Sequence, residues 1–100
     1  MNEYVICFTA VNPDDLDDAA TERIAGAAQA IPGTRPRGRV LVDRLTRRIE
    51  AEFAIDVAQA MAEAARDGGR LAKEILLAAR MPDARLVSMT VRMAEAPAPD

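Results

Sequence analysis

The sequence contains no histidine, no tryptophan and a single cysteine, Cys7. Without histidine, the chain lacks the side chain most often used as a general base, as a proton switch near neutral pH and as a metal ligand. One cysteine cannot form an internal disulfide or a cysteine-cluster metal site. Aromatic residues are limited to Tyr4, Phe8 and Phe53. We therefore expect no catalytic residues, no metal site and no cofactor.

The chain also lacks any long hydrophobic run. A helix that crosses a bilayer needs roughly 18–20 predominantly apolar residues in succession, and no stretch approaches that length. The first residues, Met1 to Tyr4, lack the basic region and apolar core of a secretory signal. The sequence therefore predicts no membrane partner and a cytoplasmic location.

The composition is that of a folded chain with enough residues for one core. Half of the 100 residues are hydrophobic, 29% are charged, and the net charge is −3. We expect one domain over residues 1–95 and a disordered tail over residues 96–100, which are proline, alanine and aspartate. Alanine accounts for 21 residues, and because each alanine buries little area, the core is expected to be thin. A second copy of the chain would cover more surface, so we expect a homodimer or another protein partner.

Four segments are predicted to be strands. Residues 4–11 form an apolar run with β-branched and aromatic side chains, which is typical of a central strand. Residues 39–43 and 49–56 predict a hairpin, and the second of these alternates cleanly between apolar and polar side chains. In the last segment, 85–94, the residues expected to face the core are Val87, Met89, Val91 and Met93.

Two helices are predicted between these strands. Asn12 and Pro13 are typical of a helix start, and apolar residues then recur at helical spacing until Pro32 and Gly33 end the pattern. The second helix is expected over residues 57–80, where Asp56 and Gln59 form a capping box. Gly68 and Gly69 interrupt this segment without shifting its apolar phase. The sequence allows either one helix with a glycine pressed against the sheet or two shorter helices.

This order of elements predicts an α+β domain with the ferredoxin-like βαββαβ plait. In that fold, a four-stranded antiparallel sheet of order 4-1-3-2 carries both helices on one face. The element order resembles that of the dimeric α/β-barrel proteins, which include small monooxygenases and degradative enzymes built from plait subunits. The resemblance implies that the helix-free faces of two copies can pack together and enclose a ligand. It transfers no site residue to this chain, because a fold does not carry a function.

The helix-free face of the sheet is the candidate interaction surface. By alternation along the strands, the side chains expected on it are Cys7, Thr9, Glu50, Glu52, Ser88, Thr90 and Arg92, with Val5 and Val11 at its ends. We expect Glu50 and Glu52 to pair across strands with Arg92 or Arg44. Cys7 would need a lowered pKa to act as a nucleophile, and we interpret it as a buried or interface strand residue.

Charges of opposite sign are segregated along the chain. An acidic block comprises Asp14, Asp15, Asp17, Asp18 and Glu22, and we expect it to cap a helix in solvent rather than to bind a cation. A candidate basic patch comprises Arg35, Arg37, Arg39, Arg44, Arg47 and Arg48. Three interpretations of this patch stay open: a solvated sheet edge, contact with an acidic protein surface, or binding to nucleic acid. Nucleic acid is disfavoured, because the predicted sheet face has no aromatic side chains on which bases could stack.

Together these patterns predict a non-catalytic accessory module that self-associates through its helix-free sheet face. The alternative is a dimeric enzyme or small-molecule binder with a pocket between that face and a partner subunit.

Overall fold

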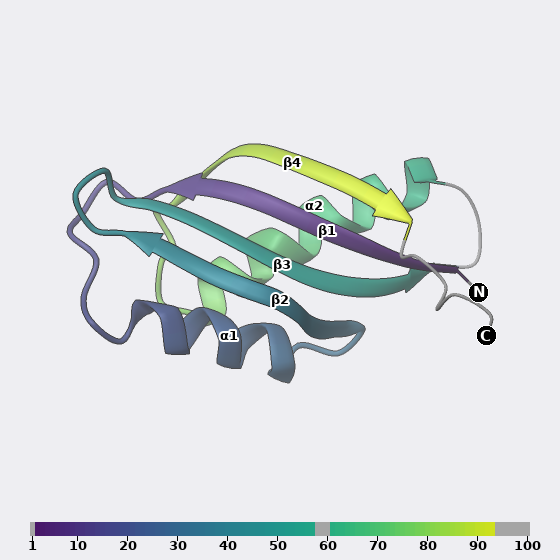
Figure 1. Cartoon of the computed structure of the whole chain (residues 1–100), viewed down its shortest axis with the longest axis horizontal. Helices are drawn as coiled ribbons and strands as arrows, with labels where there is room; N and C mark the ends of the chain where they lie inside the picture. The colour runs from purple at the N-terminus through teal and green to yellow at the C-terminus, as the bar shows by residue number, and fades with distance from the viewer. Residues whose placement is uncertain (1, 58–60, 94–100) are drawn as a thin grey trace, which may run out of the picture.

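Six elements of secondary structure follow one another in the order strand, helix, strand, strand, helix, strand (Figure 1). The structure, a computed structural model, describes residues 2–57 and 61–93, without the side chains of residues 37–39 and 57. The elements are β1 (Asn2–Val11), α1 (Ala20–Ala30), β2 (Thr34–Asp43), β3 (Arg48–Val57), α2 (Met61–Ala78) and β4 (Arg85–Met93). The predicted α+β class, with an antiparallel sheet and two helices, is confirmed.

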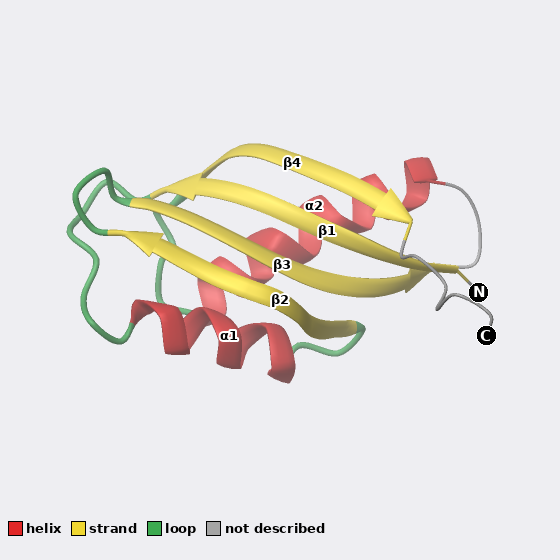
Figure 2. Ribbon diagram, in the orientation of Figure 1, coloured by secondary structure: helices red, strands yellow, loops and turns green. Residues whose placement is uncertain are grey.

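The strands form one sheet in the order β2-β3-β1-β4, so β1 and β3 are central. All three pairings are antiparallel; Ile6 of β1 lies opposite Phe53 of β3 and Val91 of β4. Figure 2 shows α2 crossing behind the central strands and α1 lying along β2. One face of the sheet therefore packs against the helices, and the other face is left uncovered by them.

The core lies between the sheet and the two helices. Ile6, Phe8 and Phe53 are fully buried, and the two phenylalanine rings meet edge to face with centroids 6.1 Å apart. Ile24 of α1 and Ile75 of α2 complete the same cluster from the helix side. The two-residue alternation of β1 and β3 thus places their large apolar side chains on one face, as predicted.

The first helix is shorter than the sequence predicted, because it begins at Ala20 and not after Asn12. Asn12 is buried; its backbone N–H donates to the Arg47 carbonyl at 2.9 Å and its side-chain amide donates to the Asp14 carbonyl at 2.9 Å. These bonds fold residues 12–19 into a loop. The Asp17 carboxylate accepts the Ala19 N–H at 3.1 Å, just ahead of the first helical turn.

The second helix is continuous through both glycines, which answers the question that the sequence left open. Gly68 lies so close to β1 that an added Cβ atom would stand 2.8 Å from Cδ1 of Ile6, whereas Gly69 has open space around it. Asp56, the predicted cap of this helix, lies within β3 and pairs with Arg35, and its predicted capping partner Gln59 falls outside the described residues.

Both edge strands differ from their predicted form. β2 begins at Thr34, where a loop was expected, and it pairs with β3 in two stretches because its register shifts between Pro36 and Val40. An edge strand tolerates such a proline and such a bulge. In β4, a register shift opposite Thr9 and Ala10 brings Leu86, not Val87, into the core row. The expected tail over 96–100 lies outside the described residues.

Candidate functional site

The helix-free face of the sheet brings together all seven residues that the sequence predicted for it. Two adjacent rows across β3, β1 and β4 hold six of them: Glu52, Cys7 and Thr90 in one row, and Glu50, Thr9 and Ser88 in the next. Arg92 follows in the neighbouring row, opposite Val5. The alternation along each strand was sufficient to assemble this surface from the sequence.

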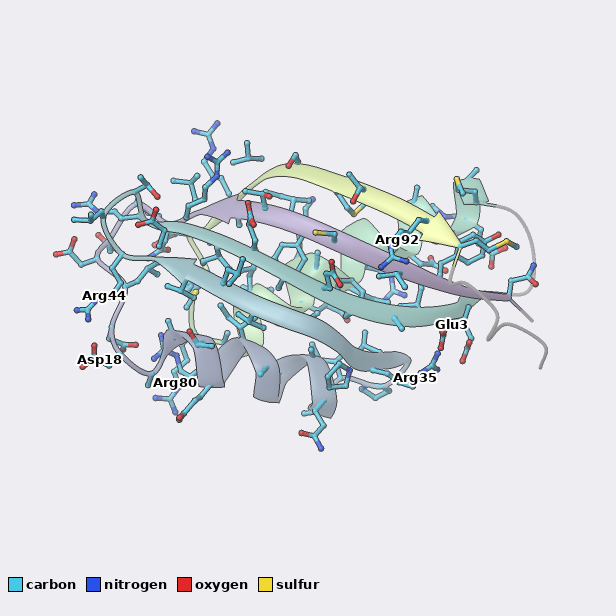
Figure 3. The ribbon with its side chains drawn as sticks, viewed as in Figure 1. Glu3, Asp18, Arg35, Arg44, Arg80 and Arg92 are labelled. Atoms are coloured by element: carbon cyan, nitrogen blue, oxygen red, sulfur yellow. The ribbon has the colours of Figure 1, made fainter. Side chains whose placement is uncertain are left out.

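Side chains on this face are more exposed on β4 than on β1. Ser88, Thr90 and Arg92 are exposed, whereas Cys7 and Thr9 on β1 are half-buried. Figure 3 shows the Arg92 side chain extending from β4 over the sheet. The face is therefore polar along its rim and partly apolar along its centre.

The carboxylates of this face do not form the ion pairs that the sequence predicted. Arg44 pairs with Asp18 instead, at the far end of β2. Among the described side chains, neither Glu50 nor Glu52 has an arginine within ion-pair distance, and Arg92 has no acidic partner. The register explains this result for Arg92, because it lies opposite Val5 and the residue opposite Glu52 is Cys7. Negative charge thus stays unneutralised on β3 and positive charge on β4.

Cys7 lies in the middle of the face, and its surroundings disfavour the thiolate. Burial raises the pKa of the Cys7 thiol, and the nearby carboxylates of Glu52 and Glu50 raise it further. A hydrogen bond from Thr90 and the charge of Arg92 act in the opposite direction but are outweighed. Because the thiolate is the reactive form, this environment agrees with the interpretation of Cys7 as a packing residue.

Two hollows lie on the β2 side of the same face. The smaller, of about 60 Å³, is lined by Cys7, Leu41, Glu50, Ala51 and Glu52. The larger, of about 270 Å³, is lined by Leu41, Val42, Asp43, Arg48 and Glu50. Both fall below the roughly 300–1,000 Å³ typical of small-molecule pockets. Leu41, which is 45% exposed, contributes to both hollows.

The arginines of the candidate basic patch do not gather into one surface. Arg35 lies at one end of the sheet, where its guanidinium pairs with Asp56 at 2.6 Å and with Glu3. These two carboxylates raise the pKa of Arg35 and hold it charged. Arg44 lies at the opposite end (Figure 3). Arg47 lies in the same β2–β3 turn as Arg44, and Arg48 begins β3. The side chains of Arg37 and Arg39 fall outside the described part of the chain.

The acidic block is the partner of the turn arginines. Arg44 pairs with Asp18, and Arg47 pairs with Asp15 at 3.1 Å while donating to the Pro13 carbonyl at 2.9 Å. Arg47 itself has a left-handed backbone, with φ of 58°. The acidic surface that the arginines contact therefore belongs to their own chain. Two blocks of opposite charge about thirty residues apart are the signal in the sequence from which this contact could have been predicted.

The described residues contain no cluster of acidic or cysteine side chains that could hold a metal ion. None of the helices in the described segments is both long and apolar enough to span a membrane. The chain matches no known protein-family model, and no curated protein resembles it closely enough in sequence to count as a relative.

Proposed function

We propose that the chain is a small accessory module that self-associates through the helix-free face of a ferredoxin-like plait and acts by protein contacts. The observation that carries this proposal is the separation of unneutralised charge on that face. Glu50 and Glu52 lie on β3 and Arg92 lies on β4, and none has an ion-pair partner among the described side chains. The free thiol of Cys7 agrees with a reducing compartment such as the cytoplasm.

A second copy of the same face supplies the missing charges. A two-fold axis makes an interface self-complementary, so a residue on β3 of one copy meets a residue of β4 in the other, and the reverse contact follows from symmetry. We assign Glu52 and Arg92 to this pair, which then forms twice in the dimer. Complementary charge of this kind sets the orientation of the two copies more than it sets the strength of binding.

Apolar surface at the centre of the face supplies the driving force. Cys7, Thr9 and Val11 are half-buried along β1, and Leu41 is 45% exposed beside them. The core of a single chain is thin, because nine of its 22 buried hydrophobic residues in the described chain are alanine. Burying more apolar area between two copies stabilises both at about 25 cal/mol per Å².

A small-molecule binder remains the second candidate, and the two hollows beside Leu41 favour it. Each hollow by itself is too small and too open to hold a ligand. A second copy packed over the face would enclose both hollows. A ligand held there would contact Cys7, Glu50 and Glu52. A dimer interface packed without an enclosed cavity would exclude this candidate.

The test is sedimentation equilibrium of charge-reversed variants at micromolar concentration. We expect the wild-type chain to sediment as a dimer and E52R and R92E each to weaken dimerisation at least about tenfold. An equimolar mixture of E52R and R92E should dimerise like the wild type, because each substituted charge then meets its opposite in the other chain. R80E is the matched control, since Arg80 lies beside α1, away from the helix-free face (Figure 3).

We expect the control variant R80E to dimerise as tightly as the wild type. A wild-type chain that stays monomeric throughout the micromolar range would overturn the proposal. So would single variants that dimerise normally, or a mixture of E52R and R92E that stays monomeric.

A further inference from the structure

The outer edge of β4 is open to another strand. β4 has only β1 as a neighbour in the described sheet, and its nine residues contain no proline. The other edge strand, β2, contains Pro36 and pairs with β3 in two separate stretches, whereas the register shift in β4 skips only Val87. A proline and a long break in pairing hinder the addition of a strand. The two edges therefore differ in their capacity for further pairing, and β4 is the accessible one.

Apolar side chains are exposed along this edge and on the helix beneath it. Val87 is 55% exposed and Met93 is 52% exposed, although both were predicted to face the core. On α2, which packs under β4, Leu77 is 59% exposed and Met61 is 49% exposed. These four account for most of the large exposed hydrophobic residues of the described chain. Their concentration at one edge indicates a contact surface.

Two hollows flank the beginning of β4 and share Arg85 and Leu86. One, of about 420 Å³, is lined from the helix side by residues that include Leu76, Leu77 and Met81. The other, of about 530 Å³, is lined by Val11, Pro13 and Val87 as well as the shared pair. Successive side chains of a strand point to opposite faces of a sheet. A strand added beside β4 would therefore direct alternate side chains into the two hollows.

The charge at this edge selects the kind of strand. Lys73 and Arg85 line the helix-side hollow, and neither has an acidic partner among the described residues. A second β4 would bring further arginines, Arg85 and Arg92, against the same edge. Because like charges across paired strands are destabilising, a second copy of this edge fits poorly and an acidic strand fits well.

We propose that the β4 edge binds an extended, acidic and apolar segment of another protein as a fifth strand. Main-chain hydrogen bonds to β4 supply affinity, and the two hollows together with Lys73 and Arg85 supply specificity. This site does not depend on self-association through the helix-free face, so either proposal can fail without the other.

The test uses a fluorescein-labelled nine-residue peptide in which glutamate alternates with valine, and the same peptide with lysine in place of glutamate. Fluorescence anisotropy should show binding of the acidic peptide only. R85E should weaken this binding at least about tenfold, whereas the matched control R80E should change it less than about twofold. Hydrogen exchange of the β4 amides, followed by NMR, should slow when the acidic peptide binds.

The exchange measurement separates strand addition from general attraction between charges. Unchanged exchange in β4, equal effects of R85E and R80E, or absence of binding would each overturn the proposal. Loss of self-association in R85E would also overturn it, since the edge would then belong to the contact between two copies. A wild-type chain that is monomeric but binds the acidic peptide would leave this site intact and remove only the proposed dimer.

Discussion

At Gly68 the backbone of α2 lies against the side chain of Ile6 in β1. Ile6 is fully buried, and a Cβ atom at position 68 would meet its Cδ1 at 2.8 Å and its Cγ1 at 3.0 Å. A close-packed core has little space into which Ile6 could shift. The single absent methyl group at Gly68 thus sets the distance between the second helix and the sheet.

Replacing this glycine is expected to destabilise the protein although alanine favours helices. The helix propensity of alanine contributes about 1 kcal/mol in favour of G68A, and overpacking costs about 1–3 kcal/mol, so we predict a net loss of up to about 2 kcal/mol. G69A is the matched control, because its new methyl group enters open space, and it should stabilise by about 0.5–1 kcal/mol. Urea unfolding of both variants measures the two effects.

The contact with Ile6 can be isolated by a double-mutant cycle. I6V removes Cδ1, the atom nearest to the new methyl group, so G68A should cost less in the I6V background. An equal cost in both backgrounds would show that the strain arises elsewhere.

The sequence offered this close approach as one of two alternatives, because the apolar phase of the second helix runs through both glycines. It did not distinguish between them. Only the structure assigns the close approach to Gly68 and open space to Gly69.

At the scale of the elements, Thr34 connects the end of α1 to the start of β2. Its hydroxyl lies 2.6 Å from the Ala28 carbonyl and 2.8 Å from the Ile31 carbonyl, and the residue is buried. The hydroxyl has one hydrogen to donate, so it satisfies one of these two acceptors at a time. This bond fixes the direction in which the chain leaves the helix.

We predict that T34V lowers the free energy of unfolding by about 1–2 kcal/mol, because it leaves a buried carbonyl without its donor. T34S keeps the hydroxyl and is the control. T34S should lose less free energy of unfolding than T34V, because only the methyl group is missing. Chemical denaturation measures the free energy of unfolding of both variants. Equal losses of that free energy in T34V and T34S would exclude the hydrogen bond as the cause.

The sequence predicted elements well where local patterning decides them and poorly where distant contacts do. β1 and β3 follow their alternation closely, within two residues of the expected ends. α1 begins later than predicted because residues 12–19 bond to the β2–β3 turn, which lies some thirty residues ahead in the chain. The exposure of Val87 follows from a register shift between β1 and β4. No local pattern in the sequence of β4 predicts this shift.

On the scale of the whole molecule, ion pairs secure both ends of the sheet. Arg35 joins β2 to Asp56 of β3 and to Glu3 of β1 at one end. At the other end, Arg44 and Arg47 hold the acidic loop. A single exposed pair contributes little, but pairs at both ends tie segments that are distant in sequence.

These pairs predict how stability depends on pH. A hydrogen bond from Arg35 lowers the pKa of Asp56 below its ordinary value of 3.8, and Arg23 lowers that of Asp17 in the same way. A carboxyl group with a lowered pKa in the folded state stabilises the protein above its unfolded pKa and loses that contribution as pH falls. Stability should therefore be constant near neutrality and decline as pH drops through about 4 and below.

D56N is the variant that tests this dependence. Thermal unfolding measured from pH 6 to pH 2 should show a shallower acid decline in D56N than in the wild type. D83N is the matched control, since Asp83 is exposed and has no ion pair in the described chain, and it should keep the wild-type slope. Parallel curves for D56N and D83N would show that the Arg35 pair does not contribute.

The helix-free face was predicted from the sequence as a set of residues but not as an electrostatic surface. Alternation alone placed Cys7, Glu52 and Arg92 on one face. Their lack of ion pairs follows from the register between strands and from Arg44 turning to Asp18. The exposed apolar side chains at the β4 edge were not predicted, because alternation along the last strand placed Val87 and Met93 toward the core.

The central position of β1 has a consequence for biosynthesis. β1 leaves the ribosome before β2, yet its neighbours in the sheet are β3 and β4. Until those later strands emerge, a nascent chain displays the largely apolar run of residues 4–11, which then has no partner. Such a segment is prone to aggregation, and a chaperone that shields extended apolar peptides would raise the yield of the native protein.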